Sequence, residues 1–203
     1  MPSPPMVDSA AFKSLVARIQ TTQSALPRSI IAIDGRGGAG KSSLARAITA
    51  AISGAIHIEY DWFHLPQAEI SNSAHRFDYR RLIQEVIEPF RGGARAFEIR
   101  RYNWGYLSGK VDGFADEPVR LQEVEMIVVE GCGILNPVLS NLFDLKIWTD
   151  TSAEESLARG IRRDIHEYGL EPEKVQSAWD EWSRWEAAAL LQDNRRLRAD
   201  IIM

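Results

Sequence analysis

The fold is decided by the stretch Gly35-Arg36-Gly37-Gly38-Ala39-Gly40-Lys41-Ser42, in which the glycines, the lysine and the serine match the pattern G-x-x-x-x-G-K-[ST]. The apolar, partly β-branched run Ser29–Ile33 precedes this stretch and predicts a buried strand. The segment Ser43–Ala50 follows it and predicts a helix. Because the motif requires a strand, a glycine-rich loop and a helix in this order, the sequence predicts a phosphate-binding P-loop rather than a turn that merely ends a strand.

The chemistry of the loop follows from its residue types. Glycine allows successive backbone N–H groups to face one anion, because no Cβ atom stands in the way, and the positive end of the following helix dipole adds to the attraction. Lys41 is expected to reach the β- and γ-phosphates of ATP, and Ser42 to place its hydroxyl on Mg²⁺. The residues predicted to bind the nucleotide and its metal are Gly35, Gly37, Gly38, Ala39, Gly40, Lys41, Ser42 and Ser43.

Composition restricts the class of protein. The chain has 203 residues, enough for one domain with a substantial core, and 45% hydrophobic and 26% charged residues are ordinary for a globular protein. The net charge of −4 argues against a nucleic-acid partner, and no apolar run approaches the roughly 20 residues that span a bilayer. The first residues lack the pattern of a signal peptide, and the single cysteine, Cys132, leaves no internal disulfide and no cysteine metal cluster. These features predict a cytoplasmic protein that does not act on membranes.

The periodicity of apolar residues predicts a single domain in two parts. Residues 1–27 are expected to form an N-terminal tip and a packing helix from Asp8 to about Gln23, with Asp8 or Ser9 as its N-cap and a partner-binding role as the alternative. Residues 28–203 are expected to form the P-loop domain. Further strands are predicted at Ala55–Ile58, Phe97–Tyr102, Met126–Val129, Leu145–Thr149 and Ala199–Ile202, and helices at Arg80–Phe90, Ala153–Tyr168 and Pro172–Arg195.

Apolar strands that alternate with helices predict an α/β fold of three layers, a parallel sheet with helices on both faces, and here a small helical lid. Such sheets bind ligands beyond the carboxyl ends of their strands. Asp61 and Glu130 each follow a predicted strand and should therefore point into that crevice. Glu130 is the candidate ligand of Mg²⁺, and Asp61 is the candidate base that orients the attacking hydroxyl and also approaches the metal. The alternatives are a surface carboxylate for Glu130 and a helix cap or turn residue for Asp61.

Two further aspartates, Asp34 and Asp150, are expected to have structural rather than catalytic roles. Asp34 adjoins the loop, where a structural hydrogen bond is favoured over a place near the metal. Asp150 ends a predicted strand and is expected to cap the next helix.

Arginines on the predicted helix Ala153–Tyr168 are candidates for a lid over the triphosphate. Arg159 and Arg163 are separated by four residues and share a helix face, with Arg162 beside them. Arginine binds phosphate oxygens with two parallel hydrogen bonds, so Arg159 and Arg163 are the predicted catalytic arginines, with a solvated basic face as the alternative.

Taken together, these stretches resemble the uridine kinase-like branch of P-loop kinases, which includes relatives of phosphoribulokinase and pantothenate kinase. The resemblance extends over roughly Ile30 to Ile202. Besides the loop, it is carried by Tyr60-Asp61-Trp62-Phe63, Arg76-Phe77-Asp78, Arg101-Tyr102-Asn103-Trp104, Val128-Val129-Glu130-Gly131, Ile147-Trp148-Thr149-Asp150, Arg159 to Asp164, and Arg198-Ala199-Asp200-Ile201-Ile202. It implies transfer of the ATP γ-phosphate to a hydroxyl, with Asp61 as base and Glu130 and Ser42 at Mg²⁺. It also implies that Asp78, Tyr102 and Arg163 help to bind the acceptor.

Departures from the family pattern concern the acceptor. His64 stands where tyrosine is usual and is itself a candidate substrate contact, since it lies near Asp61 in the sequence. The segment after Tyr102 lacks the histidine that uridine kinases of the family place near the base, and Leu170 replaces a usual arginine. The sequence therefore predicts a small-molecule kinase, with a nucleoside as the first acceptor. A sugar or vitamin precursor as acceptor, or a sensor that binds nucleotide without catalysis, is the alternative.

Three tryptophans, Trp179, Trp182 and Trp185, recur at three-residue spacing on the last predicted helix. Packing against the domain or within a homodimer is favoured over a wall that stacks on a base. Glu186 is expected to be solvated, and Cys132 to be a buried small hydrophobe.

Overall fold

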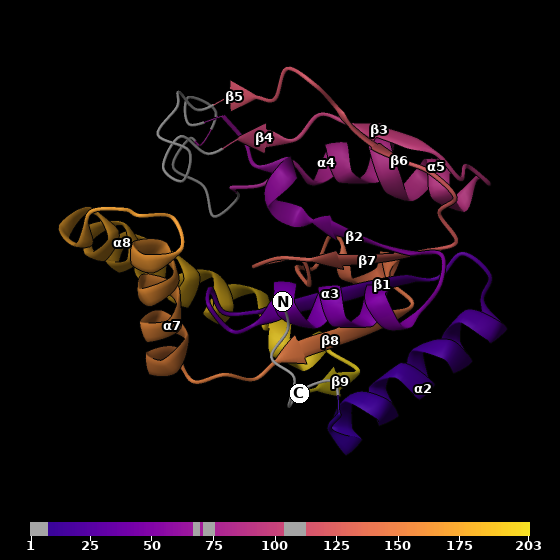
Figure 1. Cartoon of the computed structure of the whole chain (residues 1–203), viewed down its shortest axis with the longest axis horizontal. Helices are drawn as coiled ribbons and strands as arrows, with labels where there is room; N and C mark the ends of the chain where they lie inside the picture. Colours follow the sequence, from indigo (N-terminus) through magenta and orange to yellow (C-terminus); the bar gives the residue numbers. More distant parts are fainter. Residues whose placement is uncertain (1–7, 67–69, 71–75, 104–112) are drawn as a thin grey trace.

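A computed structural model describes residues 8–66, 70, 76–103 and 113–203, so the predicted tip at residues 1–7 lies outside the described residues. Within them, five strands form one parallel sheet in the order β2-β7-β1-β8-β9 (Figure 1). Their bounds are Ile30–Gly35 for β1, Ala55–Glu59 for β2, Met126–Glu130 for β7, Leu145–Thr149 for β8 and Ile201–Ile202 for β9. The predicted α/β fold with a parallel sheet is confirmed.

Strand β1 lies in the middle of the sheet and is buried along its whole length. Because side chains alternate along a strand, Ile30 and Ala32 face one layer while Ile31 and Ile33 face the other. Each pair joins a different hydrophobic cluster, which explains why the run is apolar on both faces instead of alternating with polar residues.

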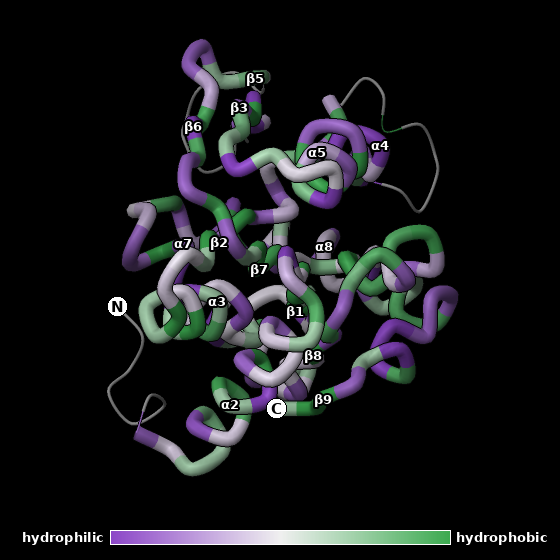
Figure 2. The backbone as a smooth tube through the Cα atoms, turned by 90° about the vertical axis from the view of Figure 1, so that its right-hand side faces the viewer, coloured by the Kyte–Doolittle hydropathy of each residue, from purple (hydrophilic) through white to green (hydrophobic). Residues whose placement is uncertain are grey.

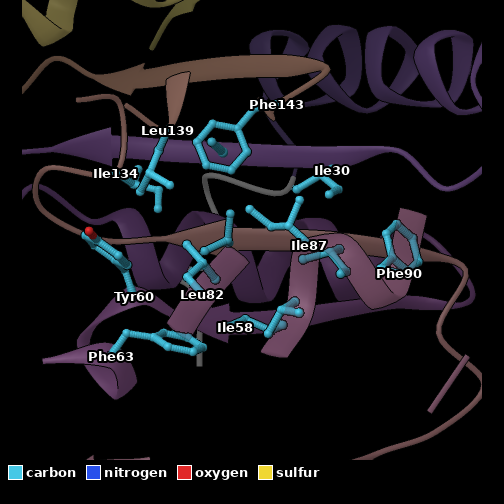
Figure 3. Packing of buried hydrophobic residues seen from close by; sticks show 14 of the residues in the cluster. Ile30, Ile58, Tyr60, Phe63, Leu82, Ile87, Phe90, Ile134, Leu139 and Phe143 are labelled. Carbon is cyan, nitrogen blue, oxygen red and sulfur yellow. The ribbon is translucent and has the colours of Figure 1, made fainter. Parts of the chain in front are cut away.

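Helices cover both faces of the sheet. One face packs on α2 (Ala10–Ala25) and α3 (Lys41–Ala51), and the other on the helical segment α4 (Tyr79–Leu82), η3 (Ile83–Ile87) and α5 (Glu88–Arg91), in which η3 is a π-helical turn. Figure 2 shows the hydrophobic strands β2 and β7 at the centre of the molecule. Figure 3 shows Leu82, Ile87 and Phe90 of the helical segment packed toward Ile30 and Ile58 of the sheet.

The N-terminal helix α2 belongs to this packing. The Ser9 side chain accepts a hydrogen bond from the Phe12 N–H at 3.1 Å, so Ser9 is the N-cap, one of the two residues predicted for that role. Phe12, Leu15 and Ile19 are buried against the sheet, as their helical spacing predicted.

The predicted strand Phe97–Tyr102 does not join the parallel sheet, so that expectation was wrong. Its residues divide between β3 (Phe97–Ile99), which pairs antiparallel with β6 (Val119–Leu121), and β4 (Tyr102–Asn103), which pairs antiparallel with β5 (Gly113–Phe114). The two small sheets lie above the central sheet in Figure 1. A short apolar run predicts a strand without indicating its partner, because the sheet to which it belongs is a matter of tertiary packing.

The lid helices α7 (Ala153–His166) and α8 (Pro172–Asp193) lie on the side toward which the arrowheads of β7 and β8 point (Figure 1). Helix α7 is capped by Ser152, whose side chain accepts from the Glu155 N–H, so the expected cap at Asp150 was wrong. Asp150 instead accepts hydrogen bonds from the Arg196 guanidinium and the Trp148 indole. Among the described residues, no helix has the combination of length and hydropathy that a bilayer crossing requires.

Gly131 links β7 to the loop that follows it, and a Cβ atom there would come within 2.5 Å of Tyr60 Cβ. We expect Gly131→Ala to reduce the free energy of unfolding by about 1–3 kcal/mol, the scale of an overpacked core. Gly113→Ala is the matched control, because its Cβ atom would meet open space. Thermal unfolding of the two variants tests this, and equal unfolding midpoints for both would contradict it.

Candidate active site

The P-loop connects β1 to α3 with the backbone conformation that the motif predicts. Gly38 and Gly40 have φ values of +81° and +92°, in the left-handed region that favours glycine. Helix α3 begins directly after Gly40, so its N-terminal N–H groups and its positive dipole end face the loop. Ser42 and Ser43 lie half-buried in the first turn of α3.

Lys41 is buried beneath the loop. Its Nζ donates to the Arg36 carbonyl oxygen at 2.9 Å and to Cys132 Sγ at 3.2 Å. Burial acts to lower the pKa of Lys41, but the hydrogen bond to Cys132 and the charge of Glu130 raise it above its ordinary value, so the ammonium stays charged. Burial raises the pKa of Cys132 to about 12, and the sulfur therefore accepts as a neutral thiol. The sequence correctly predicted a buried Cys132 but not its contact with Lys41.

Two carboxylates meet at the carboxyl ends of β2 and β7, because the parallel register places Glu59 opposite Glu130. Glu130 is buried, its Oε1 lies 3.3 Å from His57 Nε2, and the Ser42 hydroxyl helps to lower its pKa. Although burial acts to raise the pKa of Glu130, the hydrogen bond with His57 and the charge of Lys41 hold it below its usual value. Burial and the charge of Glu130 raise the pKa of Glu59. Neither the role of Glu59 nor the bond between His57 and Glu130 was predicted from the sequence, although the register of β2 and β7 places these side chains together.

Asp61 lies one turn further, in the short 3₁₀ helix η1 (Tyr60–Phe63). The surrounding protein and the charge of Glu130 raise its pKa to about 7, while Lys41 and Arg163 act to lower it. Asp61 is nevertheless exposed, so we expect water to moderate this shift. A solvent-accessible carboxylate whose pKa is affected by the charges of Lys41, Glu130 and Arg163 can orient or deprotonate a hydroxyl.

The oxygen atoms at this end of the sheet fit Mg²⁺. The Ser42 hydroxyl helps to lower the pKa of Glu130, and the charge of Glu130 raises the pKa of Asp61, so oxygen atoms of all three side chains gather at this end of the sheet. No three His, Cys, Asp or Glu side chains of the described residues form a complete metal site. This arrangement suits Mg²⁺, which binds one or two carboxylates and keeps water and substrate phosphates as its remaining ligands.

The candidate lid arginines differ in their surroundings. Arg163 Nε donates to the buried Asp164 at 2.8 Å, and Arg163 and Asp61 affect each other's pKa. Arg159 is exposed and pairs with Glu155 on the same helix, and Arg162 is exposed beside it. Arg163 therefore lies close enough to Asp61 for their charges to interact, whereas Arg159 is exposed to solvent on α7.

The residues predicted to contact the acceptor lie near η1 and α4. Asp78 accepts from the Arg81 N–H at 3.2 Å and caps α4. His64 and Tyr102 are buried, with their rings stacked at a centroid distance of 5.6 Å. His64 Nδ1 also lies 2.7 Å from the Leu65 carbonyl oxygen. The stacking of these two rings joins the end of η1 to the small antiparallel sheet of β4 and β5.

Two buried acidic side chains hold the loop from below and from the lid. Asp34 accepts from the N–H groups of Gly35, Gly133 and Leu135 at 2.7–3.0 Å, in agreement with the structural hydrogen bond favoured for it. Glu186 accepts from the Gly37 N–H at 2.7 Å and is only 5% exposed, so the expectation of a solvated Glu186 was wrong. Its contact joins positions 149 residues apart, which helical periodicity within α8 does not reveal.

A cavity of about 260 Å³ opens beside the loop. It is bounded by the P-loop, the end of β8 and the turn after α8, and its lining residues are Arg36, Trp148, Asp150, Thr151, Leu190, Asn194, Arg195, Arg196 and Leu197. Thr151 fastens this wall to the loop, because its hydroxyl donates to the Ala39 carbonyl oxygen at 3.3 Å.

Comparison with known proteins extends this picture. The model of the phosphoribulokinase / uridine kinase family matches residues 30–202. The chain belongs to this family. It is 30% identical over 152 residues to the uridine kinase of Streptococcus uberis, which covers 69% of each chain, and 27% identical over 186 residues to that of Oceanobacillus iheyensis, which covers 86% of this chain and 85% of the relative.

Solved structures share the fold at lower identity. A candidate fructose transport system kinase from Silicibacter sp. TM1040 matches with a TM-score of 0.70 at 20% identity, covering 93% of this chain and 98% of that chain. The D-glycerate 3-kinase from Cryptococcus neoformans var. grubii matches with a TM-score of 0.65 at 10% identity, covering 88% of each chain. The family identifies the protein as an ATP-dependent P-loop kinase that phosphorylates a hydroxyl of a small molecule.

Lys41 places its ammonium group beneath the phosphate loop, so we expect Lys41→Ala to lower kcat/KM by about 10²-fold or more. The fold should tolerate the change better than catalysis, because Glu130 keeps its hydrogen bond with His57. Steady-state ADP release and thermal unfolding of the same variant measure the two effects. An unfolding midpoint that collapses while the residual kcat/KM of the folded fraction stays normal would contradict this role.

Proposed function

We propose that this kinase transfers the γ-phosphate of Mg-ATP to a hydroxyl of a nucleoside, with Asp61 as the base. The observation that carries the proposal is the meeting of Asp61, Glu130 and Lys41 at the carboxyl ends of β2, β7 and β1, where the P-loop begins. The names of the relatives that align over two thirds or more of the chain support a nucleoside as acceptor.

Asp61 combines the two properties that a base for hydroxyl phosphorylation needs. It is accessible to an incoming substrate, and its raised pKa makes it a better proton acceptor than an ordinary aspartate. Arg163 is the cation that approaches Asp61 from the lid, where it can attract the charge that develops on the transferred group.

Glu130, Ser42 and Asp61 are the residues that would hold Mg²⁺, which neutralises phosphate charge when it is bound. The hydrogen bond with His57 fixes the orientation of the Glu130 carboxylate, and its lowered pKa keeps that carboxylate charged and available as a ligand.

The cavity beside the loop supports the ATP half of the proposal. A nucleotide whose phosphates lie on the loop must place its base nearby, and this cavity borders the loop at Arg36. Trp148, Leu190 and Leu197 offer apolar surface, and Asp150 and Asn194 offer polar groups that can orient a base. We therefore assign the cavity to the adenine base of ATP.

Two observations favour a second class of acceptor, which the same activity assay can test. The sequence departs from the uridine kinase pattern at His64 and after Tyr102, and structures similar to this chain include proteins named as fructose transport and glycerate kinases. A small polyol or hydroxy acid is therefore the alternative acceptor.

The test is ADP release with Mg-ATP against nucleosides, sugars, hydroxy acids and pantothenate, together with a measurement of ATP binding alone. Stimulation by uridine or cytidine is the expected result. Stimulation only by another alcohol would overturn the nucleoside and keep the mechanism. ATP binding without stimulation by any member of the panel would count against both acceptor classes.

We expect Asp61→Asn to bind ADP with nearly normal affinity and to lose about 10²-fold or more in kcat, the scale of a lost positioned base. Asparagine keeps the shape of the side chain but cannot take a proton at neutral pH. Isothermal titration with Mg-ADP and turnover with the stimulating acceptor measure the two quantities. Turnover close to that of the unmodified protein would show that another group is the base.

Leu197 lines the cavity assigned to adenine and is 80% exposed, so its replacement should not disturb the fold. We expect Leu197→Arg to weaken Mg-ATP binding about fivefold, as for the loss of roughly 1 kcal/mol of apolar contact. Leu191→Arg is the matched control, because Leu191 is 82% exposed and is not among the residues that line this cavity. Equal affinities of the two variants would place the base elsewhere.

A further inference from the structure

Glu186 makes a contact that the kinase motifs do not explain. It lies in the second half of α8, far from the loop in sequence, yet its Oε1 accepts from the Gly37 N–H at 2.7 Å. Its Oε2 lies 3.6 Å from the Arg36 guanidinium. A buried carboxylate is stable only when it is paired and hydrogen-bonded, and here both partners come from the first half of the P-loop.

The helices around Glu186 pack on the loop without a gap. A Cβ atom on Gly37 would come within 2.9 Å of Trp182 Nε1 and 3.0 Å of the Trp179 ring. A Cβ atom on Gly38 would collide with the Ser156 carbonyl oxygen of α7, and one on Gly160 would collide with Trp179. The glycines at 37 and 38 therefore allow the approach of the lid helices as well as that of phosphate.

Helix α8 is in turn fixed to α7. The Trp179 indole N–H donates to Asp164 at 2.7 Å, and the same carboxylate accepts from Arg163 at 2.8 Å. A chain of hydrogen-bonded and packed side chains thus runs from Arg163, which approaches Asp61, through Asp164 and Trp179 to the helix that carries Glu186. This chain makes polar contact with the loop through Glu186, which accepts from the Gly37 N–H and pairs with Arg36.

We propose that Glu186 is a positioning residue that fastens α8 to the P-loop and thereby sets both the loop conformation for phosphate binding and the place of Arg163. The inference extends the proposed function, because it concerns the same phosphate site, but it does not depend on the identity of the acceptor. Glu186 acts through Gly37 and Arg36 and does not itself touch the reacting atoms.

Two variants of similar size distinguish the effect of the length of the Glu186 side chain from the effect of its charge. Glu186→Gln keeps the length and an oxygen acceptor for the Gly37 N–H, whereas Glu186→Asp keeps the charge but withdraws the carboxylate by one methylene. We expect Glu186→Asp to weaken Mg-ADP binding about tenfold, the scale of one lost hydrogen bond to a charged group, and Glu186→Gln to stay within about threefold. Glu173→Ala, exposed on the first turn of the same helix, is the control.

Mg-ADP binding is measured by isothermal titration, and kcat with the stimulating acceptor follows for each folded variant. The expected result is a loss in both quantities for Glu186→Asp and near-normal values for Glu186→Gln and Glu173→Ala. Affinity for Mg-ADP equal to that of the unmodified protein in Glu186→Asp would overturn the proposal, as would tighter binding in Glu186→Gln, which would show a carboxylate that repels phosphate. Since ADP binding needs no acceptor, failure to find an acceptor leaves this test intact.

Discussion

The carboxylate of Asp34 is the point at which the phosphate site is joined to the rest of the fold. It lies at the end of the central strand, fully buried, and accepts the N–H groups of Gly35, Gly133 and Leu135. Its Oδ1 also lies 3.4 Å from the equally buried Arg195 guanidinium. One side chain therefore fixes the start of the P-loop, the turn after β7 and the segment after α8, three regions that are far apart in the sequence.

The energetic cost of this arrangement is spread over many bonds. Removing water from a charged pair costs several kcal/mol per ion, and the mutual attraction of the pair repays this only when further hydrogen bonds satisfy the remaining atoms. The three backbone donors to Asp34 supply those bonds, which is why an acidic residue is stable in the middle of an apolar sheet. The same backbone bonds orient the turn after β7, in which Cys132 contacts Lys41.

Local sequence was sufficient to predict the parts of the site whose chemistry depends on consecutive residues. The P-loop was predicted from residues 35–42, and the positions of Asp61 and Glu130 followed from the rule that parallel strands end at one edge of a sheet. The cap at Ser9 and the buried face of α2 were likewise encoded within a few residues. Each of these features depends on backbone geometry or apolar periodicity within one short segment of the chain.

Interactions between distant segments could not be predicted in this way. Glu186 has the sequence context of a solvent-facing residue on a charged helix, and only the packing of α8 on Gly37 buries it. Phe97–Tyr102 has the pattern of a strand, but the pairing partners of its residues lie 12 to 24 residues later, in Gly113–Phe114 and Val119–Leu121. Asp150 was predicted to cap the next helix, but Ser152, two residues further on, is equally suited to that role. In the structure Ser152 caps α7, and Asp150 accepts a hydrogen bond from Arg196, which is 46 residues away in the sequence.

The two halves of the active site consequently depend on different kinds of interaction. Phosphate is bound by backbone N–H groups, whose positions are set by a short glycine-rich loop and by the buried Asp34 and Glu186. The surface predicted for the acceptor is made of side chains from η1, α4 and β4, and these touch one another through ring packing among His64, Phe77 and Tyr102. The phosphate half therefore depends on backbone bonds to two buried carboxylates, whereas the acceptor half depends on ring packing among side chains. His64, which departs from the family pattern, belongs to the half that depends on ring packing, while the P-loop, which keeps the pattern, belongs to the half that depends on backbone bonds.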